Sequence, residues 1–420
     1  MAEGIILLTK HFPFNNGETP AETYLENEIS LLCKNANRVF VIATEATEGS
    51  KITCKLPENA DCIALQTKKQ RVVKSACVAK ALPMLLSAKL PEVKAEAKVL
   101  GLKKKLFLNY FVKRAEQKLS RIDRAVTSGR LNPTDYDTIY SYWFFDNAYA
   151  AVKMRDKYHM KHTACVSRAH GYDLYEYANS LGYLPLRKYL FQKLDMVYAC
   201  SQDGRDYLNQ RFEGFSEKIQ TSFLGCADCG VQEISRQKGR IRIASCSHIV
   251  PLKRVERIGE CAAKLSEKGI EVEWTHMGGG ALFEQLKERV KLLEGKVHVK
   301  LTGMISNTQI MENYRSSDFD VFVNASTREG IPISIMEAIS FGIPVAATDV
   351  GGTHEIITHE KNGFLFDKDF SDDDLAGVLE RICTMSDSDY QVLRENARNT
   401  FKEKFEFENN VNTFLSSIPR

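Results

Sequence analysis

The sequence of 420 residues lacks any long hydrophobic run and any regular spacing of its cysteines. No apolar stretch reaches the roughly 18 residues that a membrane-spanning helix requires. Gly4–Leu8 is a short apolar stretch without the basic flank or the cleavage site of a signal peptide, so it favours a first buried strand. Eleven cysteines, an odd number without a framework spacing, favour reduced thiols in a cytosolic protein over a set of disulfides.

Three motifs that could carry chemistry are incomplete. Asp318-Phe-Asp320 has the D-x-D form of some metal sites, but it begins a predicted buried strand, which its acids more simply cap or flank. Cys226-Ala-Asp-Cys229 has no second pair at zinc spacing. Gly278–Gly280 lacks the G-x-G-x-x-G form and the later acidic residue of a dinucleotide site. The sequence therefore predicts neither a metal nor a bound cofactor.

The composition is that of a soluble globular protein, with 44% hydrophobic and 26% charged residues, and the length allows two or three domains. The net charge of +3 is unevenly distributed. Lys68–Arg124 holds 16 Lys and Arg against 4 Asp and Glu, a local net charge of +12, so the remainder carries −9. A partner that binds this basic segment is one interpretation of the asymmetry.

Short apolar runs alternate with helix patterns in the second half of the chain, which predicts a parallel, doubly wound sheet. Helices are expected at Leu252–Lys268 and Ile333–Phe341, and Ser306 with Gln309 has the form of a capping box at a helix start. The expected strands are Ile241–Ile249, Glu271–Gly278, Val297–Gly303, Val321–Ala325 and Pro344–Val350.

The first half shows the same alternation less regularly. Helical patterns lie at Glu22–Leu32 and Asp146–Lys157, and the basic segment is a long helical insertion that Pro83 and Pro91 break. The expected strands are Ile5–Thr9, Arg38–Ala43, Cys62–Gln66, Thr138–Trp143, Cys165–His170, Val197–Ser201 and Ile219–Leu224.

These patterns predict an α/β protein with two Rossmann-like, doubly wound domains facing a cleft, and ligands at the carboxyl ends of the strands. The first domain is expected at residues 1–224, with the basic helical insertion at about 68–124. A linker at 225–239 leads to the second domain at 240–395. Residues 396–420 are expected to form C-terminal helices, the last of which packs back on the first domain.

The stretch from Ser326 to Glu337 combines a strand end, a turn and a helix start. Gly330 allows a ligand close to the backbone, and Pro332 loses no hydrogen bond in a first helical turn. Unpaired N–H groups at such a turn suit a diphosphate. Glu329 lies in the turn and Glu337 one to two turns into the helix, and helical side chains lean toward the N-terminus, so both carboxylates can reach one ligand. Carboxylates accept hydrogen bonds from the vicinal hydroxyls of ribose and sugars.

The residues that follow make a longer ordered pattern: Ala338, Gly342-Ile-Pro344 and Asp349-Val-Gly-Gly-Thr-His-Glu355. The whole pattern resembles the E-x7-E region of the retaining family 4 glycosyltransferases, of the kind that builds bacterial surface polysaccharides. The likeness covers Val297–Phe366, including Tyr314 and Asn362-Gly363, and extends more loosely over nearly the whole chain. The alternative is an ordinary helix N-terminus with surface acids, which explains fewer of the matching positions.

The resemblance implies a role for each part of this region. Glu329 would hold hydroxyls of the donor sugar as a catalytic residue, and Glu337 would hold the ribose. The backbone of the turn would meet the sugar and the phosphates, and the end of the preceding strand would form the nucleobase pocket. The implied donor-binding residues are Gly330, Ile331, Pro332, Ile333 and Ser334 in the turn, and Gly303, Met304 and Ile305 in the pocket.

Ser247–Arg254 resembles the phosphate clamp of the same family, with one departure. The family has an Arg and a Lys five residues apart, and this sequence has Lys253 in register but His248 in place of the Arg. Lys253 would supply a cation to the leaving diphosphate. A neutral His cannot replace a bidentate Arg, so either Arg254 compensates or the phosphate site is weaker. A surface helix start with basic residues remains the alternative.

Two loops in the first half resemble the acceptor side of such enzymes. Phe12–Glu18 is similar to a glycine-containing family loop, whose acceptor-side residues would be Asn16, Gly17 and Glu18. His170-Gly-Tyr-Asp173 matches the family's HG-x-D pattern and places His170 against the transferred sugar, with a structural histidine as the alternative. The acids of the helix that follows the first loop are interpreted as a solvated face, namely Glu22, Glu26 and Glu28.

The basic segment leaves two interpretations open. Lys103–Arg114 interleaves cations with apolar residues, which suits an interfacial helix on an anionic membrane. The alternative is a solvated helix whose apolar side packs on its own domain. Nucleic acid is not expected, because no recognition module accompanies the charge.

The resemblance thus implies a cytoplasmic, metal-independent, retaining glycosyltransferase, peripheral on the inner face of the membrane if the basic segment binds lipid. Its substrates would be a UDP- or GDP-linked sugar and a saccharide or lipid-linked acceptor. No protein nucleophile and no general base is identified; the diphosphate leaves and the acceptor hydroxyl enters on the same face. A phosphorylase or epimerase of the same fold is one alternative. A catalytically silent relative that binds nucleotide or a partner transferase is another.

Overall fold

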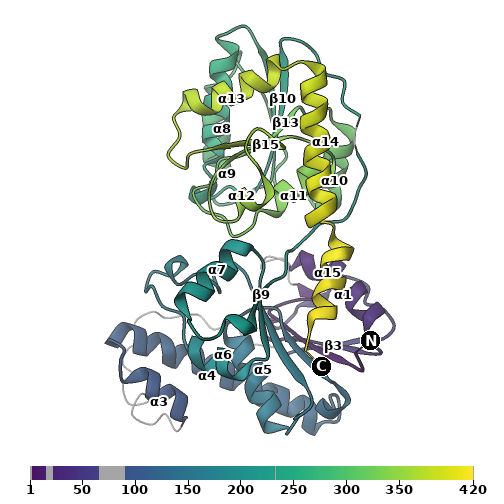
Figure 1. Ribbon diagram of the computed structural model, residues 1–420, viewed down its shortest axis with the longest axis vertical. Helices are drawn as coiled ribbons and strands as arrows, with labels where there is room; N and C mark the ends of the chain where they lie inside the picture. Colours follow the sequence, from purple (N-terminus) through teal and green to yellow (C-terminus); the bar gives the residue numbers. More distant parts are fainter. Residues whose placement is uncertain (1, 16–21, 66–89, 232, 420) are drawn as a thin grey trace. The chain divides into compact units, whose positions relative to one another are not determined.

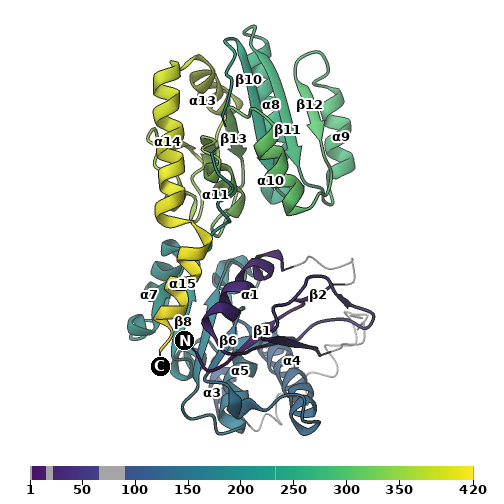
Figure 2. The same cartoon turned by 90° about the vertical axis from the view of Figure 1, so that its right-hand side faces the viewer.

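The computed structural model describes residues 2–15, 22–65, 90–231 and 233–419, and the chain divides into two compact units (Figure 1). Unit 1 comprises Met1–Ser222 together with Val411–Arg420, and unit 2 comprises Phe223–Asn410. Each unit is built on one parallel sheet with helices packed against it (Figures 1 and 2). The predicted α/β fold with two Rossmann-like domains is confirmed.

The seven-stranded sheet of unit 1 has the order β5-β3-β1-β6-β7-β8-β9, and every pairing is parallel. The central strand β1 aligns Ile5 with Val39 on one side and with Thr138 on the other. Strands β2 and β4 form a separate, short antiparallel pair. The strands are β1 (Ile5–Thr9), β2 (Phe14–Asn15), β3 (Val39–Ala43), β4 (Lys51–Ile52), β5 (Ala60–Ala64), β6 (Thr138–Ser141), β7 (Ala164–Ala169), β8 (Met196–Ala199) and β9 (Ile219–Thr221).

The helices of unit 1 connect these parallel strands, as right-handed crossovers of this fold require. They are α1 (Thr23–Asn35), α3 (Pro91–Ala97), α4 (Leu102–Thr127), α5 (Asp146–Lys157), α6 (Arg187–Lys193) and α7 (Gln202–Arg211), with short 3-10 turns η1 (Pro133–Asp135), η2 (Glu176–Ala178) and η3 (Ser216–Lys218).

The six-stranded sheet of unit 2 has the order β12-β11-β10-β13-β14-β15, again entirely parallel. Helix α8 packs on α13, and α11 packs on α14 (Figure 2). The strands are β10 (Arg240–Cys246), β11 (Glu271–Met277), β12 (His298–Leu301), β13 (Val321–Asn324), β14 (Val345–Thr348) and β15 (Gly363–Phe366). The helices are η4 (Pro251–Lys253), α8 (Val255–Ser266), α9 (Phe283–Lys291), α10 (Asn307–Ser316), α11 (Ile333–Ser340), α12 (Thr353–Ile356), α13 (Asp372–Thr384), α14 (Asp387–Lys404) and α15 (Phe407–Ser417).

Both sheets reverse their winding direction beside their first strand. In unit 1 the chain moves outward from β1 to β5 and then returns to the other side of β1 with β6. In unit 2 it does the same around β10, with β13 on the returning side. A reversal of this kind opens a crevice at the carboxyl ends of the two strands, and ligands of doubly wound folds bind there. A ligand site is therefore expected at the loops that follow β1, β6, β10 and β13.

The structure changes one helix boundary that matters for the site. The sequence pattern predicts a helix from Leu252, but Pro251–Lys253 forms a separate 3-10 turn and α8 begins at Val255. Arg254 between them is left-handed, with φ 46°. Because this residue breaks the helix, Lys253 lies in the loop after β10 instead of on a helix face. The capping box predicted at Ser306 is present, with both reciprocal hydrogen bonds of Ser306 and Gln309 formed.

The described part of the basic segment contributes to the core of unit 1. The apolar face of α4 packs against α5, and Leu108, Phe111 and Val112 are buried. Phe111 contacts Phe145 edge-on, with ring centroids 5.0 Å apart. Pro91 is the first residue of α3, whereas Pro83 lies outside the described residues. Of the two interpretations of Lys103–Arg114, this packing favours the helix whose apolar side covers its own domain.

The last helix, α15, begins in unit 2 and ends among the residues of unit 1. Its Phe414 is buried between Tyr140 and Tyr198, with each ring centroid 4.9 Å away. The Arg168 guanidinium lies 4.5 Å from the Phe414 ring and pairs with the buried Glu28. Within the described residues, no helix has both the length and the hydropathy to cross a membrane.

Candidate functional site

In unit 2 the polar side chains of the predicted site gather after β10 and β13, the two strands at the reversal. Glu329, in the loop between β13 and α11, is only 10% exposed as a side chain. Its Oε1 accepts hydrogen bonds from Ser326 Oγ (2.6 Å) and Asn324 Nδ2 (3.1 Å). The carboxylate is therefore held in place by residues of its own loop.

Lys253 joins the two loops. Its Nζ lies 2.6 Å from Glu329 Oε1, so the cation after β10 pairs with the acid after β13. The Lys253 side chain is 22% exposed and keeps part of its ammonium available to solvent. Neither residue could be placed beside the other from sequence distance, because 75 residues separate them along the chain. The topology of the sheet brings them together.

Two glycines, Gly351 and Gly352, pack against the backbone of the turn that carries Glu329. Gly351 has φ +52°, and a Cβ there would lie 2.0 Å from the carbonyl oxygen of Glu329. Gly352 donates its N–H to the carbonyl oxygen of Gly330 at 2.8 Å. A side chain at Gly351 would push the Glu329 loop away from β14. This contact gives a physical reason for the glycine pair that belongs to the sequence pattern.

The helix start that follows supplies backbone donors. Ile331 and Pro332 are buried, and Pro332 is the N-cap of α11, so Ile333 and Ser334 form its first turn. The N–H groups of a first turn have no preceding helical carbonyl to bind. Together with Lys253, these donors make the turn suitable for the oxygens of a diphosphate.

Glu337 lies one turn into α11 and is buried, at 8% exposed. Its Oε1 accepts a hydrogen bond of 2.7 Å from Asn307 Nδ2, at the start of α10. Burial raises the pKa of Glu337 to about 7, and the Asn307 contact opposes that shift only in part. Unlike Glu329, this carboxyl has no cation bonded to it among the described residues, so its charge state changes near neutral pH.

The residues predicted for the nucleobase pocket lie between β12 and α10. Gly303 has φ +68°, and its carbonyl oxygen accepts the N–H of Gly278 from the loop after β11. Met304 is 66% exposed and lies against Gly279, where an added Cβ would come within 2.9 Å of the Met304 side chain. Ile305 is half-buried. The backbone of the glycine triplet Gly278–Gly280 thus packs against the predicted pocket.

The two other basic residues of the predicted phosphate clamp, His248 and Arg254, have different surroundings. His248 is exposed in the loop after β10. Arg254 donates from Nε to the carbonyl oxygen of Ala325 at 2.8 Å, and its guanidinium lies 4.9 Å from the Phe370 ring. Because these contacts use the guanidinium to fasten the end of β13, they do not support the idea that Arg254 compensates for the missing arginine.

In unit 1, His170 follows β7 at the carboxyl edge of the sheet. Its ring stacks near Tyr142 and Trp143, with centroids 4.7 and 4.6 Å away. Neither ring nitrogen has a hydrogen-bond partner in the part of the chain that the structure describes, and Nδ1 lies 3.8 Å from an Asp173 carboxylate oxygen. Both ring nitrogens are buried, and the imidazole is packed between aromatic rings and the Asp173 carboxylate.

Asp173 stabilises the loop that carries His170. It is fully buried and accepts the N–H groups of His170 and Phe144, both at 2.8 Å. Burial raises the pKa of Asp173, but the contacts with His170 and the charge of Arg187 outweigh that effect, and the net pKa is lowered. Asp173 therefore positions the His170 loop. The predicted acceptor-side residues Asn16, Gly17 and Glu18 lie outside the described residues.

The interpretation of three glutamates as a solvated face is wrong for two of them. Glu22 accepts the backbone N–H groups of His11 (2.7 Å) and Phe12 (2.8 Å) and the indole N–H of Trp143 (2.5 Å). Glu28 is buried and pairs with Arg168. Only Glu26 is exposed. A helix period cannot reveal this, because the partners lie outside the helix: His11 and Phe12 in the loop after β1, Trp143 after β6 and Arg168 in β7.

Residues Asp318 and Asp320 flank the start of β13, as the sequence pattern indicates. Asp320 is buried and accepts two hydrogen bonds of 3.0 Å from the Arg242 guanidinium, and Asp318 pairs with the same side chain at 3.0 Å. The D-x-D motif therefore fixes β13 to β10.

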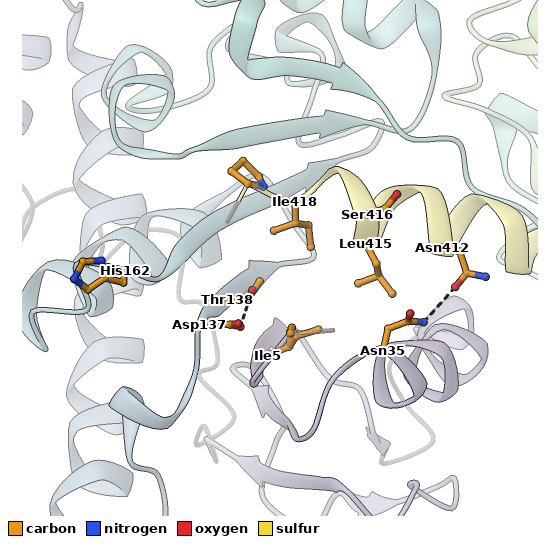
Figure 3. A pocket seen from close by; sticks show the side chains of 11 residues that line it. Ile5, Asn35, Asp137, Thr138, His162, Asn412, Leu415, Ser416 and Ile418 are labelled. Carbon is orange, nitrogen blue, oxygen red and sulfur yellow. Dashed lines mark hydrogen bonds between the residues drawn. The ribbon is translucent and has the colours of Figure 1, made fainter.

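A cavity of about 240 Å³ lies elsewhere in unit 1, near the amino ends of β1 and β6 (Figure 3). Ile5 and Thr138 line it from the sheet, and Asn412 and Leu415 line it from α15. Asn35 donates to Asn412 at its rim, at 3.2 Å. Since ligands of doubly wound sheets bind at carboxyl ends, this cavity lies at the wrong end of the sheet for the predicted chemistry.

Two doubly wound units of this topology define the GT-B class of glycosyltransferase fold. Sucrose-phosphate synthase of Thermosynechococcus elongatus superposes with a TM-score of 0.70 and 15% identity, covering 98% of this chain and 97% of that one. The Anabaena protein HepE, solved in complex with UDP-glucose, gives a TM-score of 0.62 and 17% identity, covering 99% of this chain and 100% of HepE. At these identities the similarity establishes the fold.

The family match concerns unit 2. Residues 231–400 match the family described as glycosyl transferases group 1. The O-antigen biosynthesis glycosyltransferase WbnH of Escherichia coli is 30% identical over 166 residues, which are 40% of this chain and 43% of WbnH. The putative colanic acid biosynthesis glycosyltransferase WcaL of Escherichia coli K12 is 24% identical over 260 residues, 59% of this chain and 62% of WcaL. The chain thus covers less than half the length of WbnH.

Proposed function

We propose that this protein is a retaining glycosyltransferase that moves a sugar from a nucleoside diphosphate to an acceptor in the synthesis of a cell-surface polysaccharide. The observation that carries the proposal is the Lys253–Glu329 pair, 2.6 Å apart at the reversal of the unit 2 sheet. It lies beside the first turn of α11 and one turn from Glu337, within the region that matches glycosyl transferases group 1. The names of the two relatives, an O-antigen biosynthesis glycosyltransferase and a putative colanic acid biosynthesis glycosyltransferase, support the class of product.

Each group has a chemical task in this proposal. Glu337 accepts hydrogen bonds from the ribose hydroxyls, and Lys253 with the first-turn N–H groups neutralises the diphosphate. Glu329 binds hydroxyls of the donor sugar and is kept in place by Ser326 and Asn324. The bond between the anomeric carbon and the phosphate oxygen breaks, and the acceptor oxygen bonds to that carbon on the same face. The proton of the acceptor hydroxyl passes to the departing phosphate.

This chemistry requires no metal ion, because Lys253 and the backbone donors of α11 occupy the place where charge develops on the leaving group. A UDP- or GDP-linked sugar is the proposed donor. Support for the uridine nucleotide comes from the UDP-glucose bound by HepE, which shares the fold.

The test is release of nucleoside diphosphate by the full chain with a panel of UDP- and GDP-sugars, with and without added saccharides, and with and without EDTA. We expect one donor to yield nucleoside diphosphate, faster with an acceptor present, and product whose anomeric configuration by NMR matches the donor. An inverted product would reject the retaining assignment. Activity that disappears with EDTA and returns with magnesium or manganese would reject the metal-free phosphate site.

A catalytically silent relative is the second candidate, and the placement of His248 and Arg254 is the observation that favours it. The family's arginine is absent, and Arg254 is bonded to the carbonyl oxygen of Ala325. Calorimetric binding of UDP or GDP without nucleotide release from any donor would support this candidate over the enzyme.

A further inference from the structure

Lys10 lies directly after β1, at the reversal of the unit 1 sheet, and is held by aromatic faces. Its Nζ lies 4.1 Å from the centroid of the Tyr172 ring and 4.6 Å from that of Trp143. Trp143 follows β6 and Tyr172 follows β7, so three neighbouring strands contribute to this arrangement. Cation–π contacts stabilise an ammonium without using its hydrogen-bond donors.

The carboxylates around the Lys10 ammonium are all bonded to other groups. Glu22 accepts three backbone N–H groups, those of Lys10, His11 and Phe12, and the Trp143 indole N–H. Glu45 pairs with Arg114 and Lys118, and Asp173 accepts the N–H groups of Phe144 and His170.

The Lys10 ammonium has neither a hydrogen-bond acceptor nor an ion-pair partner among the described residues, and only the backbone N–H of Lys10 is bonded to Glu22. Burial lowers the pKa of Lys10, and the charges of Glu45, Asp173 and Glu22 only partly oppose that effect. A half-buried ammonium without an acceptor gains more from an incoming oxyanion than an exposed one, because less water has to be displaced. The His170 ring lies 4.6 Å from the Trp143 ring and packs on the side of the indole, with both of its nitrogens buried.

We propose that Lys10 is a specificity-determining residue that binds an oxyanion, a carboxylate or a phosphate, carried by the saccharide acceptor. This inference rests on the proposed function, since it names the class of acceptor. Its ammonium donates to the anion, and Tyr172 and Trp143 hold the Lys10 side chain at the carboxyl edge of the sheet. A neutral saccharide would leave the Lys10 ammonium without an acceptor.

A purely structural role makes a different prediction. If Lys10 only stacks the loops after β1, β6 and β7 together, Lys10→Met would lower stability and Lys10→Arg would restore it, with no effect on ligands. If Lys10 binds the acceptor anion, the variants must change the affinity for anions specifically.

The experiment measures binding of three probes, methyl α-glucoside, glucuronic acid and glucose 1-phosphate, by saturation-transfer NMR. The full chain carries Lys253→Met throughout, so that the phosphate site of unit 2 does not contribute. It is compared with the same chain carrying Lys10→Met, Lys10→Arg or Lys161→Met. Lys161 is an exposed lysine before β7, at the amino edge of the same sheet, and is the matched control.

We expect at least one of the two anionic probes, glucuronic acid and glucose 1-phosphate, to bind at least about tenfold more tightly than methyl α-glucoside. Lys10→Met should remove this preference, Lys10→Arg should keep part of it, and Lys161→Met should leave it unchanged. Glucuronic acid alone would identify a carboxylate, and glucose 1-phosphate alone a phosphate. Equal binding of all three probes, no binding of any, or an unchanged preference in Lys10→Met would overturn the inference.

The outcome is independent of the donor reaction. Anion binding through Lys10 without nucleotide release from any donor would reject the proposed function and keep the anion site. Nucleotide release by the unaltered chain, with probes indifferent to Lys10→Met, would keep the function and reject this acceptor class.

Discussion

The carboxyl edges of the two sheets have the same topology but different chemistry. At the edge of unit 2, a lysine and a glutamate are bonded directly, Lys253 to Glu329, and glycines press the backbone close to them. At the edge of unit 1, the lysine is Lys10, whose ammonium lies over aromatic rings, while the acids around it are bonded to backbone N–H groups or to other cations. One strand order therefore supports two kinds of site.

The difference follows from which side chains the loops supply. Short polar residues and glycines let backbone donors and an ion pair share one small volume, which suits a compact diphosphate. Trp143, Tyr172 and His170 occupy more space and offer faces and ring edges, which suits a ligand that varies in shape, such as an acceptor sugar. Unit 2 should therefore control nucleotide affinity, and unit 1 should control what receives the sugar.

The largest effect should come from Lys253→Met, which removes the cation from the unit 2 edge. We expect turnover to fall about 10²–10³-fold, because the charge developing on the leaving diphosphate loses its nearest side-chain donor. Nucleotide release measures this, with Lys291→Met on the exposed surface of α9 as the control. Turnover within about threefold of the unaltered protein would place the phosphate elsewhere.

Glu337→Ala should weaken binding of the free nucleoside diphosphate about 10- to 100-fold, the value of hydrogen bonds to a charged group. Glu329→Gln should spare that affinity and lower turnover, because Glu329 is assigned to the sugar. Calorimetry and a turnover assay on both variants separate the two carboxyls. Equal loss of nucleotide affinity in both variants would contradict the division of roles.

A smaller effect is expected from pH, because burial raises the pKa of Glu337 to about 7. Ribose hydroxyls donate to the ionised carboxylate, so nucleotide affinity should rise about tenfold from pH 6 to pH 8 and then level off. Glu337→Gln should flatten this profile. A pH profile that is the same in Glu337→Gln would assign the titration to another group.

The same pKa makes a prediction for stability. The unfolded chain loses the Glu337 proton near pH 4.5, whereas the folded chain keeps it until about pH 7, so the folded state binds more protons in that window. The free energy of unfolding therefore falls as pH rises from 4.5 to 7. Because Glu337→Gln removes this penalty, the variant should be more stable than the unaltered protein at pH 8, by on the order of 1–3 kcal/mol, and about equal to it at pH 4.5. Urea unfolding at the two pH values measures the difference.

The smallest effect on the fold should come from Lys103, Lys104 and Lys105 in α4. Changing all three to Gln should lower the free energy of unfolding by no more than about 1 kcal/mol, because Lys103 is exposed, Lys104 and Lys105 are half-buried, and among the described residues the Lys104 ammonium contacts only the Tyr183 ring, 5.6 Å away. If the unaltered protein co-sediments with anionic vesicles at low salt, the same variant should lose that binding, since roughly 1 kcal/mol per lysine is removed. No binding by the unaltered protein at low salt would leave only the packing role of α4.

Arg114 belongs to the same basic stretch but not to the same class of residue. It is bonded to Asp146, which is 1% exposed, and to Glu45. Arg114→Gln should therefore cost about 1–3 kcal/mol of stability. The segment that composition presents as one basic patch contains surface charges at one end and a buried network at the other.

Local chemistry determined a large part of this protein. Apolar runs separated by caps and glycines specify the strands of both sheets, and the ordered pattern from Ser326 to Glu355 specifies a turn with a carboxylate in it. These features depend on residues a few positions apart, whose hydrogen bonds and packing are settled by local backbone geometry. The strands β2 and β4 are two residues long each and exposed or half-buried, so they leave little hydrophobic pattern to read.

Only the tertiary structure decided which partners these residues have. Lys253 reaches Glu329, Arg254 is bonded to the end of β13, Glu22 binds the indole of Trp143, and the Lys10 ammonium is left without an acceptor among the described residues, all through contacts between segments far apart in the chain. Charge and helical period describe each residue alone, whereas burial and hydrogen-bond partners depend on which strands the sheet places side by side. For that reason, one lysine or glutamate lies on the surface, another stabilises the fold and a third belongs to the candidate site, although the residue type is the same.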